Sequence, residues 1–229
     1  MTTTTPTTTP VAGTLTARAL LFDMDGTLVD SGAAVERTWT RFADRHGLDV
    51  AAILADSHGR PTAETVARHA PPGTDLAAET EWLVRQDVAD TTGTVALPGA
   101  AALLAALPVE RWALVTSASG ELARRRMAAA GLPMPRVVVS ADDVVHGKPD
   151  PEGYVRAAAA LGVAPAEALV LEDAEAGLRA ALAAGAPALV VGPHGGPLAD
   201  GLPRITDFDG IVPRILADGI ALELPASRP

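Results

Sequence analysis

The stretch Ala19–Ser31, ALLFDMDGTLVDS, decides how the rest of the sequence is interpreted. Four apolar residues are followed by two aspartates one residue apart, Asp23 and Asp25, and then by a Gly-Thr pair. A short apolar run that ends at turn residues predicts a buried strand. Carboxylates at the end of such a strand cost free energy unless a partner or a reaction uses them. The pattern therefore predicts a functional site where this strand ends.

The composition limits both the size of the fold and the class of partner. The 229 residues, 48% of them hydrophobic, are enough for one core, or for one core and a small satellite domain. The absence of cysteine excludes disulfides and thiolate metal sites. A net charge of -10 argues against nucleic acid or an anionic membrane as the main partner, but it permits a small phosphorylated ligand in a locally positive pocket.

The N-terminal segment and the hydropathy of the sequence bear on the cellular location of the protein. The first residues are rich in Thr and Pro and have no signal-peptide pattern, so we expect a disordered tail over residues 1–16. No uncharged apolar run of 18 residues occurs, which predicts no transmembrane helix. We therefore expect a cytoplasmic protein. A separate expectation is that it is a monomer or a weak dimer.

Apolar runs of strand length alternate with helical segments through most of the chain, which predicts a doubly wound parallel sheet. The expected strands are Arg18–Phe22, Trp112–Val115, Val137–Ser140, Ala168–Leu171 and Ala188–Val191. The expected helices between the later strands are Gly99–Leu107, Glu121–Ala130, Pro151–Leu161 and Ala174–Ala184.

One interval breaks this alternation. Between Ser31 and Pro98 the pattern predicts helices and no strand, and this stretch is too long for a simple strand-to-helix connection. We expect an all-helical cap over residues 32–96, inserted into a core formed by residues 17–31 and 97–229. Such an insertion would cover the carboxyl ends of the strands, where sheets of this kind bind ligands. The expected cap helices are Ala33–His46, Val50–Ala55, Ala63–His69 and Leu76–Ala89.

Polar side chains follow four of the predicted strands at their carboxyl ends, so the fold should gather them in one place. Four carboxylates there would repel one another without a counter-ion, and an all-oxygen ligand set suits Mg²⁺. Carboxylates, a lysine and hydroxyl groups together predict a phosphate site, where one acid attacks phosphorus and the other transfers a proton. The residues concerned are Asp23, Asp25, Thr116, Ser117, Lys148, Glu172 and Asp173.

These motifs, DMDGT, a hydroxyl after the second strand, GKPDP and LED, resemble the haloacid dehalogenase superfamily over about residues 17–200. The likeness is to the subgroup with a helical cap after the first motif, and more loosely to its sugar-phosphate and polyol-phosphate phosphatases. The resemblance implies Asp23 as the nucleophile and Asp25 as the acid and base. It also implies Mg²⁺ held by Asp23, by the backbone carbonyl of Asp25 and by Asp173, with Glu172 nearby or bound through water.

The resemblance further implies that Lys148 and either Thr116 or Ser117 hold the phosphoryl oxygens, and TSAS leaves both hydroxyls open. The cap should recognise the leaving group, and His58 and Arg60 in SHGRPT are our candidates, with a plain surface turn as the alternative.

The predicted function is a Mg²⁺-dependent phosphatase for a small phosphorylated sugar or polyol. The alternative is a phosphosugar mutase on the same fold, which would need extra cationic groups in the cap. A haloacid dehalogenase is disfavoured because such enzymes lack the acid at Asp25 and the metal. A non-catalytic binding protein is disfavoured because all the catalytic groups are present. The cap arginines available to a mutase are Arg37, Arg41, Arg45, Arg60, Arg68 and Arg85.

Overall fold

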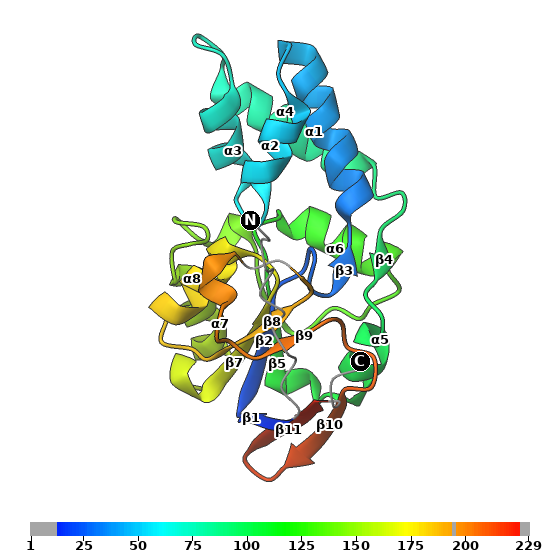
Figure 1. The fold of residues 1–229 in the computed structure, drawn as a ribbon, viewed down its shortest axis with the longest axis vertical. Helices are drawn as coiled ribbons and strands as arrows, with labels where there is room; N and C mark the ends of the chain where they lie inside the picture. Colours follow the sequence, from blue (N-terminus) through cyan, green and yellow to red (C-terminus); the bar gives the residue numbers. More distant parts are fainter. Residues whose placement is uncertain (1–12, 194–195, 225–229) are drawn as a thin grey trace, which may run out of the picture.

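The computed structural model describes residues 13–193 and 196–224, and it shows a helical cap standing on an α/β core (Figure 1). Within these residues the core has a six-stranded parallel sheet in the order β6-β5-β2-β7-β8-β9. The predicted doubly wound fold with an inserted helical cap is confirmed. The strands are β2 (Ala19–Phe22), β5 (Trp112–Val115), β6 (Val137–Val139), β7 (Ala168–Glu172), β8 (Ala188–Val191) and β9 (Arg204–Ile205).

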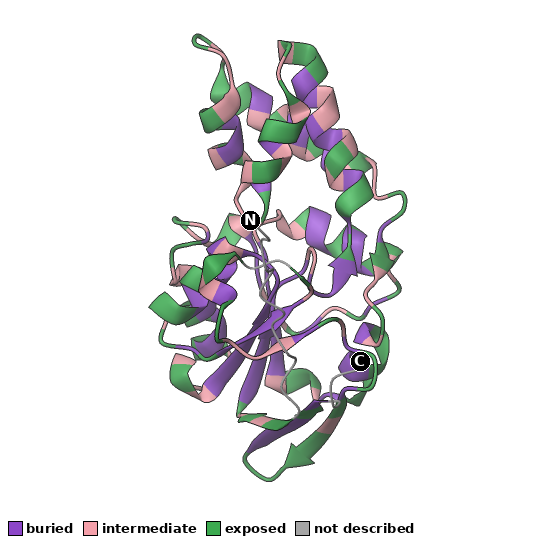
Figure 2. Cartoon of the chain, viewed as in Figure 1, coloured by how far each residue is buried: buried purple, intermediate pink, exposed green. Residues whose placement is uncertain are grey.

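The central strand β2 is apolar throughout because helices cover both faces of the sheet. Its side chains alternate, so that Leu20 and Phe22 pack into one hydrophobic cluster and Ala19 and Leu21 into the other. Helices α5 (Ala100–Ala106) and α6 (Gly120–Ala129) contribute to the first cluster, and α7 (Glu152–Ala160) and α8 (Glu175–Ala183) to the second. Figure 2 shows the resulting buried centre of the core.

The cap has a hydrophobic cluster of its own, in which Trp39, Phe42, Ile53, Val66 and Leu83 are buried. Two short strands, β3 (Val29–Asp30) and β4 (Val95–Ala96), pair antiparallel where the chain enters and leaves the cap. The expectation of no strand between Ser31 and Pro98 is therefore wrong at β4, because two residues are too few for a sequence pattern to show. The cap helices are α1 (Gly32–His46), α2 (Val50–Ser57), α3 (Thr62–His69) and α4 (Leu76–Ala89).

A small antiparallel sheet, β1-β11-β10, packs beneath the core at the end away from the cap (Figure 1). Its strands are β1 (Gly13–Ala17), β10 (Val212–Leu216) and β11 (Gly219–Leu224). The tail expected over residues 1–16 is therefore wrong from Gly13 onward, because this segment pairs with β11 and Leu15 packs against the core. Residues 1–12 lie outside the described residues. No helix in the described ranges is both long and apolar enough to cross a bilayer.

The return from the cap to the core depends on Gly99, the N-cap residue just before α5, which has a φ of 77°. A Cβ atom there would lie 2.3 Å from the backbone carbonyl carbon of Phe208, the residue whose N–H bonds to Pro98 O. Gly73, in the turn before α4, has a φ of 89°, but a Cβ atom added there would have nothing within 4 Å. Both glycines therefore have a positive φ, but only at Gly99 would an added Cβ atom clash with a neighbouring residue.

We predict that Gly99→Ala lowers the free energy of unfolding clearly more than Gly73→Ala. The left-handed backbone alone costs an alanine about 1–2 kcal/mol, and at Gly99 the clash adds to this cost. Urea unfolding of the two variants beside the unsubstituted chain measures both effects. Equal losses at the two positions would show that Phe208 does not constrain the return segment.

Candidate active site

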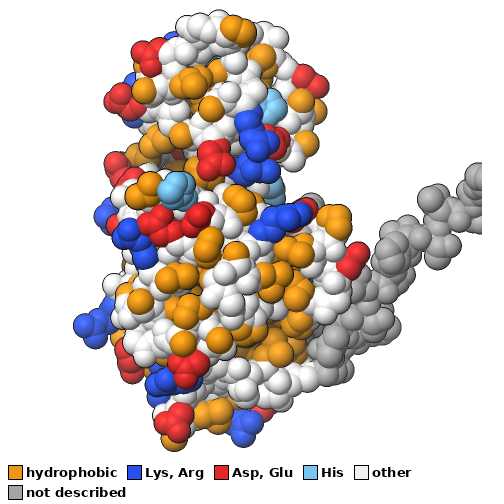
Figure 3. Space-filling view, turned by 90° about the vertical axis from the view of Figure 1, so that its left-hand side faces the viewer, with side chains coloured by type: hydrophobic (Ala, Val, Ile, Leu, Met, Phe, Trp, Pro, Cys, Tyr) orange, Lys and Arg blue, Asp and Glu red, His pale blue; other side chains and the backbone are white. Residues whose placement is uncertain are grey.

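The carboxyl ends of three neighbouring strands bring the predicted site residues together. Strand β2 lies between β5 and β7 and is in parallel register with both. Asp23 therefore follows β2 at the same edge of the sheet at which Thr116 follows β5 and Glu172 ends β7. Figure 3 shows charged and histidine side chains gathered at the waist where this edge meets the cap.

The ammonium group of Lys148 joins two of these strand ends. Its Nζ lies 2.5 Å from Asp23 Oδ1 and 2.7 Å from Glu172 Oε1, and it also donates to the carbonyl oxygen of Val115 at 3.1 Å. The side chain is buried and is the only lysine in the sequence. Burial alone would lower the pKa of Lys148, but the carboxylates of Asp23 and Glu172 outweigh it and hold the pKa well above its ordinary value. The group is therefore a fixed positive charge at the centre of the site.

Glu172 is completely buried and is held on both carboxylate oxygens. Oε1 accepts from Lys148 and, at 3.2 Å, from the hydroxyl of Tyr154, while Oε2 accepts from the N–H of Ala174 at 2.8 Å. Tyr154 belongs to α7 and was not predicted from the sequence. A tyrosine in an amphipathic helix gives no sign of such a contact until the helix is packed against β7.

Asp23, Glu172 and Asp173 form a buried acidic cluster. One carboxylate oxygen from each lies within 4.8 Å of the others. Burial, opposed by Lys148 and reinforced by Glu172, raises the pKa of Asp23 to about 7. Burial also raises the pKa of Asp173 well above its usual range, and Glu172 and Asp23 add to the rise. Lys148 contacts only two of the three carboxylates, so the ionised forms of all three would carry more negative charge than this one ammonium group balances.

The structure itself indicates that this cluster fits a cation. Oδ2 of Asp173 is buried and has no hydrogen-bond donor among the described residues, and Oδ1 accepts from Thr27 at 3.3 Å. Gly26 permits this approach, because a Cβ on its backbone would lie 2.1 Å from Asp173 Oδ2. An undonated oxygen beside two further carboxylates suits a hard divalent cation. The carboxylate of Asp25 is not in the cluster, and its backbone carbonyl stays a predicted ligand.

Asp25 is held from two sides through Oδ1. The hydroxyl of Ser31 donates to this oxygen at 2.6 Å, and Nη1 of Arg126 lies 2.8 Å from it. Arg126 comes from α6 and is buried. This arginine was not predicted from the sequence, because it is the third of three consecutive arginines and only the helix phase distinguishes it from its neighbours.

The two hydroxyls after β5 differ in their surroundings. Oγ1 of Thr116 accepts from the N–H of Ala118 at 3.1 Å. The hydroxyl of Ser117 instead donates to the carbonyl oxygen of Gly59 in the cap, at 3.0 Å. Thr116 is thus bound into the strand end, whereas Ser117 joins the core to the cap loop.

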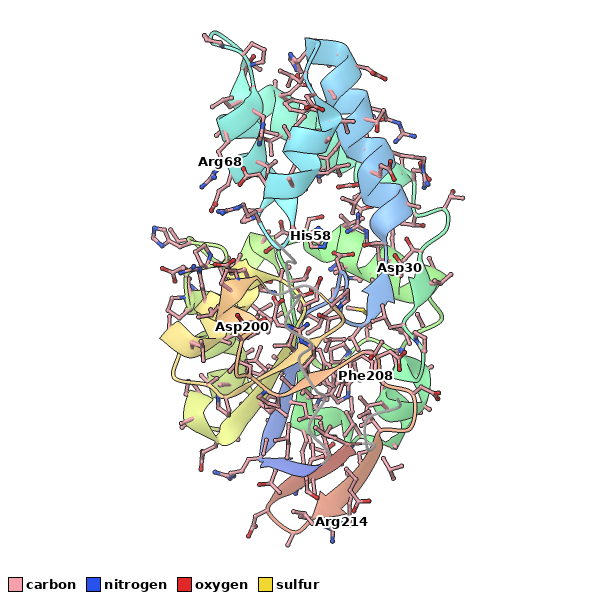
Figure 4. The ribbon with its side chains drawn as sticks, in the orientation of Figure 1. Asp30, His58, Arg68, Asp200, Phe208 and Arg214 are labelled. Carbon is pink, nitrogen blue, oxygen red and sulfur yellow. The ribbon has the colours of Figure 1, made fainter. Side chains whose placement is uncertain are left out.

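A cavity of about 500 Å³ between cap and core, here the catalytic cavity, reaches the site. Asp23, Asp25, Thr116 and Asp173 line it from the core. From the cap, His58 and Arg60 line it too, and Figure 4 places His58 where the cap faces the core. Nε2 of His58 lies 3.7 Å from Asp173 Oδ2. Nε of Arg60 lies 3.5 Å from Asp56 Oδ1 within the cap.

A parallel α/β sheet with a buried centre of acids and one lysine beneath a helical cap is the arrangement of an α/β enzyme. The family model for haloacid dehalogenase-like hydrolases matches residues 17–185. Hexitol phosphatase A of Escherichia coli is 47% identical over 76% of this chain and 82% of its own length. The chain belongs to the haloacid dehalogenase-like hydrolase family.

Two further likenesses agree with this assignment. 2-Deoxyglucose-6-phosphate phosphatase 1 of Saccharomyces cerevisiae is 35% identical over 72% of this chain and 76% of its own length. The crystal structure of CbbY from Rhodobacter sphaeroides in complex with phosphate superposes with a TM-score of 0.70 and 26% identity, covering 85% of this chain and 96% of that one.

Because Lys148 is the only lysine, its environment can be measured directly by counting amine labels. We predict that an amine-acylating reagent labels Lys148 much more slowly in the folded protein than in the chain unfolded in urea. The buried, charged ammonium group lacks the free lone pair that acylation needs. Intact-mass spectrometry counts the labels, and peptide mapping locates them. Labelling of Lys148 in the folded chain at the rate seen in urea would contradict the buried contact.

Proposed function

We propose that this chain is a Mg²⁺-dependent phosphatase that hydrolyses a small phosphorylated sugar or polyol through an aspartyl-phosphate on Asp23. The observation that carries the proposal is the position of Asp23. Its carboxylate lies against Lys148 in a buried acidic cluster and also borders the catalytic cavity. The names of the relatives reported above, phosphatases of a hexitol phosphate and of a sugar phosphate, agree with it.

The proposed reaction uses the two aspartates in two steps. A carboxylate oxygen of Asp23 attacks phosphorus while the bond to the alcohol oxygen breaks, and Asp25 gives that oxygen a proton. A water then attacks phosphorus, and Asp25 takes a proton from that water. The bond between phosphorus and the Asp23 oxygen breaks, which releases phosphate and restores the Asp23 carboxylate. Phosphate monoesters react so slowly in water that one proton transfer, worth about 10²–10⁴-fold, cannot account for turnover. The covalent step and the surrounding charges must supply the rest.

The charged groups around Asp23 have separate roles in this scheme. Asp23, Glu172 and Asp173, with the backbone carbonyl of Asp25, would hold Mg²⁺, which offsets negative charge on the carboxylates and on a bound phosphoryl group. Lys148 binds a phosphoryl oxygen and favours the ionised form of Asp23. Between the two hydroxyls, we propose Thr116 for the phosphoryl group, because Ser117 already donates to Gly59.

The mutase alternative needs cations for a second phosphate, and the arrangement of the cap argues against it. Each of the six cap arginines lies in an ion pair with a cap carboxylate. Arg60 is the only one of them among the described residues that line the catalytic cavity. A second cavity of about 390 Å³ adjoins Lys148 and Thr116, but Glu64, Asp142 and Asp150 line it. Such walls repel a second phosphate and accept a neutral, hydroxylated leaving group.

The remaining expectations from the sequence belong to this proposal as well: a small phosphorylated metabolite as partner, a cytoplasmic location, and a monomer or weak dimer. Domain limits of 17–31 and 97–229 for the core and 32–96 for the cap are also part of it, with the core extended to include β1.

We predict that the chain releases phosphate from hexitol or sugar monophosphates when Mg²⁺ is present and no bisphosphate activator is added. Chelation should abolish release, and so should Asp23→Asn, because the attacking atom must be a carboxylate oxygen. A phosphate-release screen with thermal unfolding of each variant makes the test. Activity of Asp23→Asn above a few per cent would remove Asp23 as the nucleophile, and a need for a bisphosphate would favour the mutase.

The structure gives the proposed role of the cap loop a matched test. Arg60 and Arg68 both pair with Asp56, but Arg60 lines the catalytic cavity and Arg68 does not. We predict that Arg60→Ala lowers kcat/KM for the best sugar or polyol phosphate by at least about three- to tenfold, the loss expected for one ordinary hydrogen bond, because a charged donor contributes more than a neutral one. p-Nitrophenyl phosphate, which has no hydroxyls to bind, should lose less, and Arg68→Ala should change neither value.

His58→Ala is the companion variant, with the same expected direction. An equal loss on both substrates would assign the loop to closure or catalysis. No loss on either would make SHGRPT a surface turn without a part in recognition.

A further inference from the structure

The three consecutive arginines of α6 lie in different environments. Arg124 and Arg125 are exposed, and Arg125 pairs with Glu121 one turn earlier on the same helix. Arg126 is 3% exposed. An arginine is rarely buried unless its charge is paired, because the desolvation of an unpaired ion costs several kcal/mol. The partners of Arg126 therefore decide what this residue does.

Arg126 contacts one carboxylate in the core and one in the cap. Its Nη1 lies 2.8 Å from Asp25 Oδ1, and its Nη2 lies 3.4 Å from Asp87 Oδ1. Asp87 belongs to α4 and is fixed there by the hydroxyl of Thr38, which donates to the same oxygen at 2.7 Å. One guanidinium group thus connects the cap to the carboxylate of Asp25.

The contact of Arg126 with Asp25 and Asp87 borders the catalytic cavity. Asp25, Asp87 and Arg126 all line the catalytic cavity. Within the described residues, the hydrogen bonds and ion pairs of the Asp25 carboxylate fall on Oδ1, from Ser31 and Arg126. A hydrogen bond from Ser31 and an ion pair with Arg126 on the same oxygen restrict the rotation of the carboxylate and leave Oδ2 for the oxygen of a leaving group. A proton transfer needs such an orientation, because donor and acceptor must come within about 2.6–3.2 Å.

We infer that Arg126 is a positioning residue for the proton transfer by Asp25, and that Asp87 of the cap holds it in place. The inference rests on the proposed function, in which Asp25 protonates the leaving alcohol. The acid is correctly placed when the cap is docked, because Asp87 and Asp25 bind the same guanidinium group. A substrate that keeps the cap docked therefore also keeps Asp25 oriented, without any direct contact between cap and acid.

The test compares two leaving groups. Sorbitol 6-phosphate releases an alkoxide that needs a proton, whereas p-nitrophenyl phosphate releases a stable phenolate that does not. The value of kcat/KM covers the steps up to release of the leaving group, so a misplaced acid should lower it selectively for the sorbitol ester. The main variant is Arg126→Gln combined with Asp87→Asn, because this pair leaves no unpaired buried charge from the cap contact.

We expect the double variant to lose about 10- to 100-fold in kcat/KM on sorbitol 6-phosphate, within the ~10²–10⁴-fold range of general acid catalysis, and less than about threefold on p-nitrophenyl phosphate. Arg126→Lys, which keeps the charge, should recover part of the loss. Asp87→Asn alone should show the same selectivity at about three- to tenfold, since Arg126 then keeps one of its two carboxylates. Arg125→Gln is the matched control on the exposed face of α6 and should change neither substrate.

Equal losses on the two substrates, or full activity in a double variant that is as stable as the unsubstituted chain, would overturn the inference. No effect of Asp87→Asn would overturn the part played by the cap. These outcomes differ from failure of the proposed function, in which the unsubstituted chain would release phosphate from neither ester and both proposals would fall together.

Discussion

The ammonium group of Lys148 lies between the carboxylates of Asp23 and Glu172, and the rest of the site depends on this contact. Two strands, β2 and β7, end in acids that would repel each other in a buried place. The lysine balances part of that charge and ties the loop after β6 to both strand ends. Glu172 in turn is held by Tyr154 and by the backbone of Ala174. The buried polar groups therefore form a connected set in which each member restricts the next.

The core could be predicted from the sequence because its signals are local. Short apolar runs gave β2, β5, β6, β7 and β8 within a residue or two, and parallel strands bring their carboxyl ends to one edge of a sheet. That placement was enough to gather the acids, the lysine and the hydroxyls. The small sheet of β1, β10 and β11 was missed because β10 is largely exposed and β1 follows a Thr-rich segment, so neither shows the apolar run of a buried strand.

The parts of the site that could not be predicted from the sequence are contacts between elements. Tyr154 reaches Glu172 from α7, and Arg126 reaches Asp25 from α6, a helix that lies beyond the whole cap in the chain. Neither residue has a local pattern that distinguishes it from a packed tyrosine or a solvated arginine. The choice between Thr116 and Ser117 was open for a similar reason, since it depends on Gly59 in the cap. Such roles depend on the side of the helix on which a residue lies and on how the cap packs against the core.

The arginines of the cap do not form a cationic surface for anions, because cap carboxylates pair with them. Arg37 and Arg41 share Asp90, Arg45 pairs with Glu79, and Arg60 and Arg68 share Asp56. These ion pairs hold segments of the cap together, and they neutralise the charges of the arginines within the cap. The positive charge at the catalytic edge of the core then comes from Lys148 and Arg126, and both are already paired with carboxylates. In the proposed function, a phosphoryl group bound there would share Lys148 with Asp23, which would place phosphorus beside the proposed nucleophile. Under the same proposal, the cap would select the leaving group by its size and hydroxyl groups.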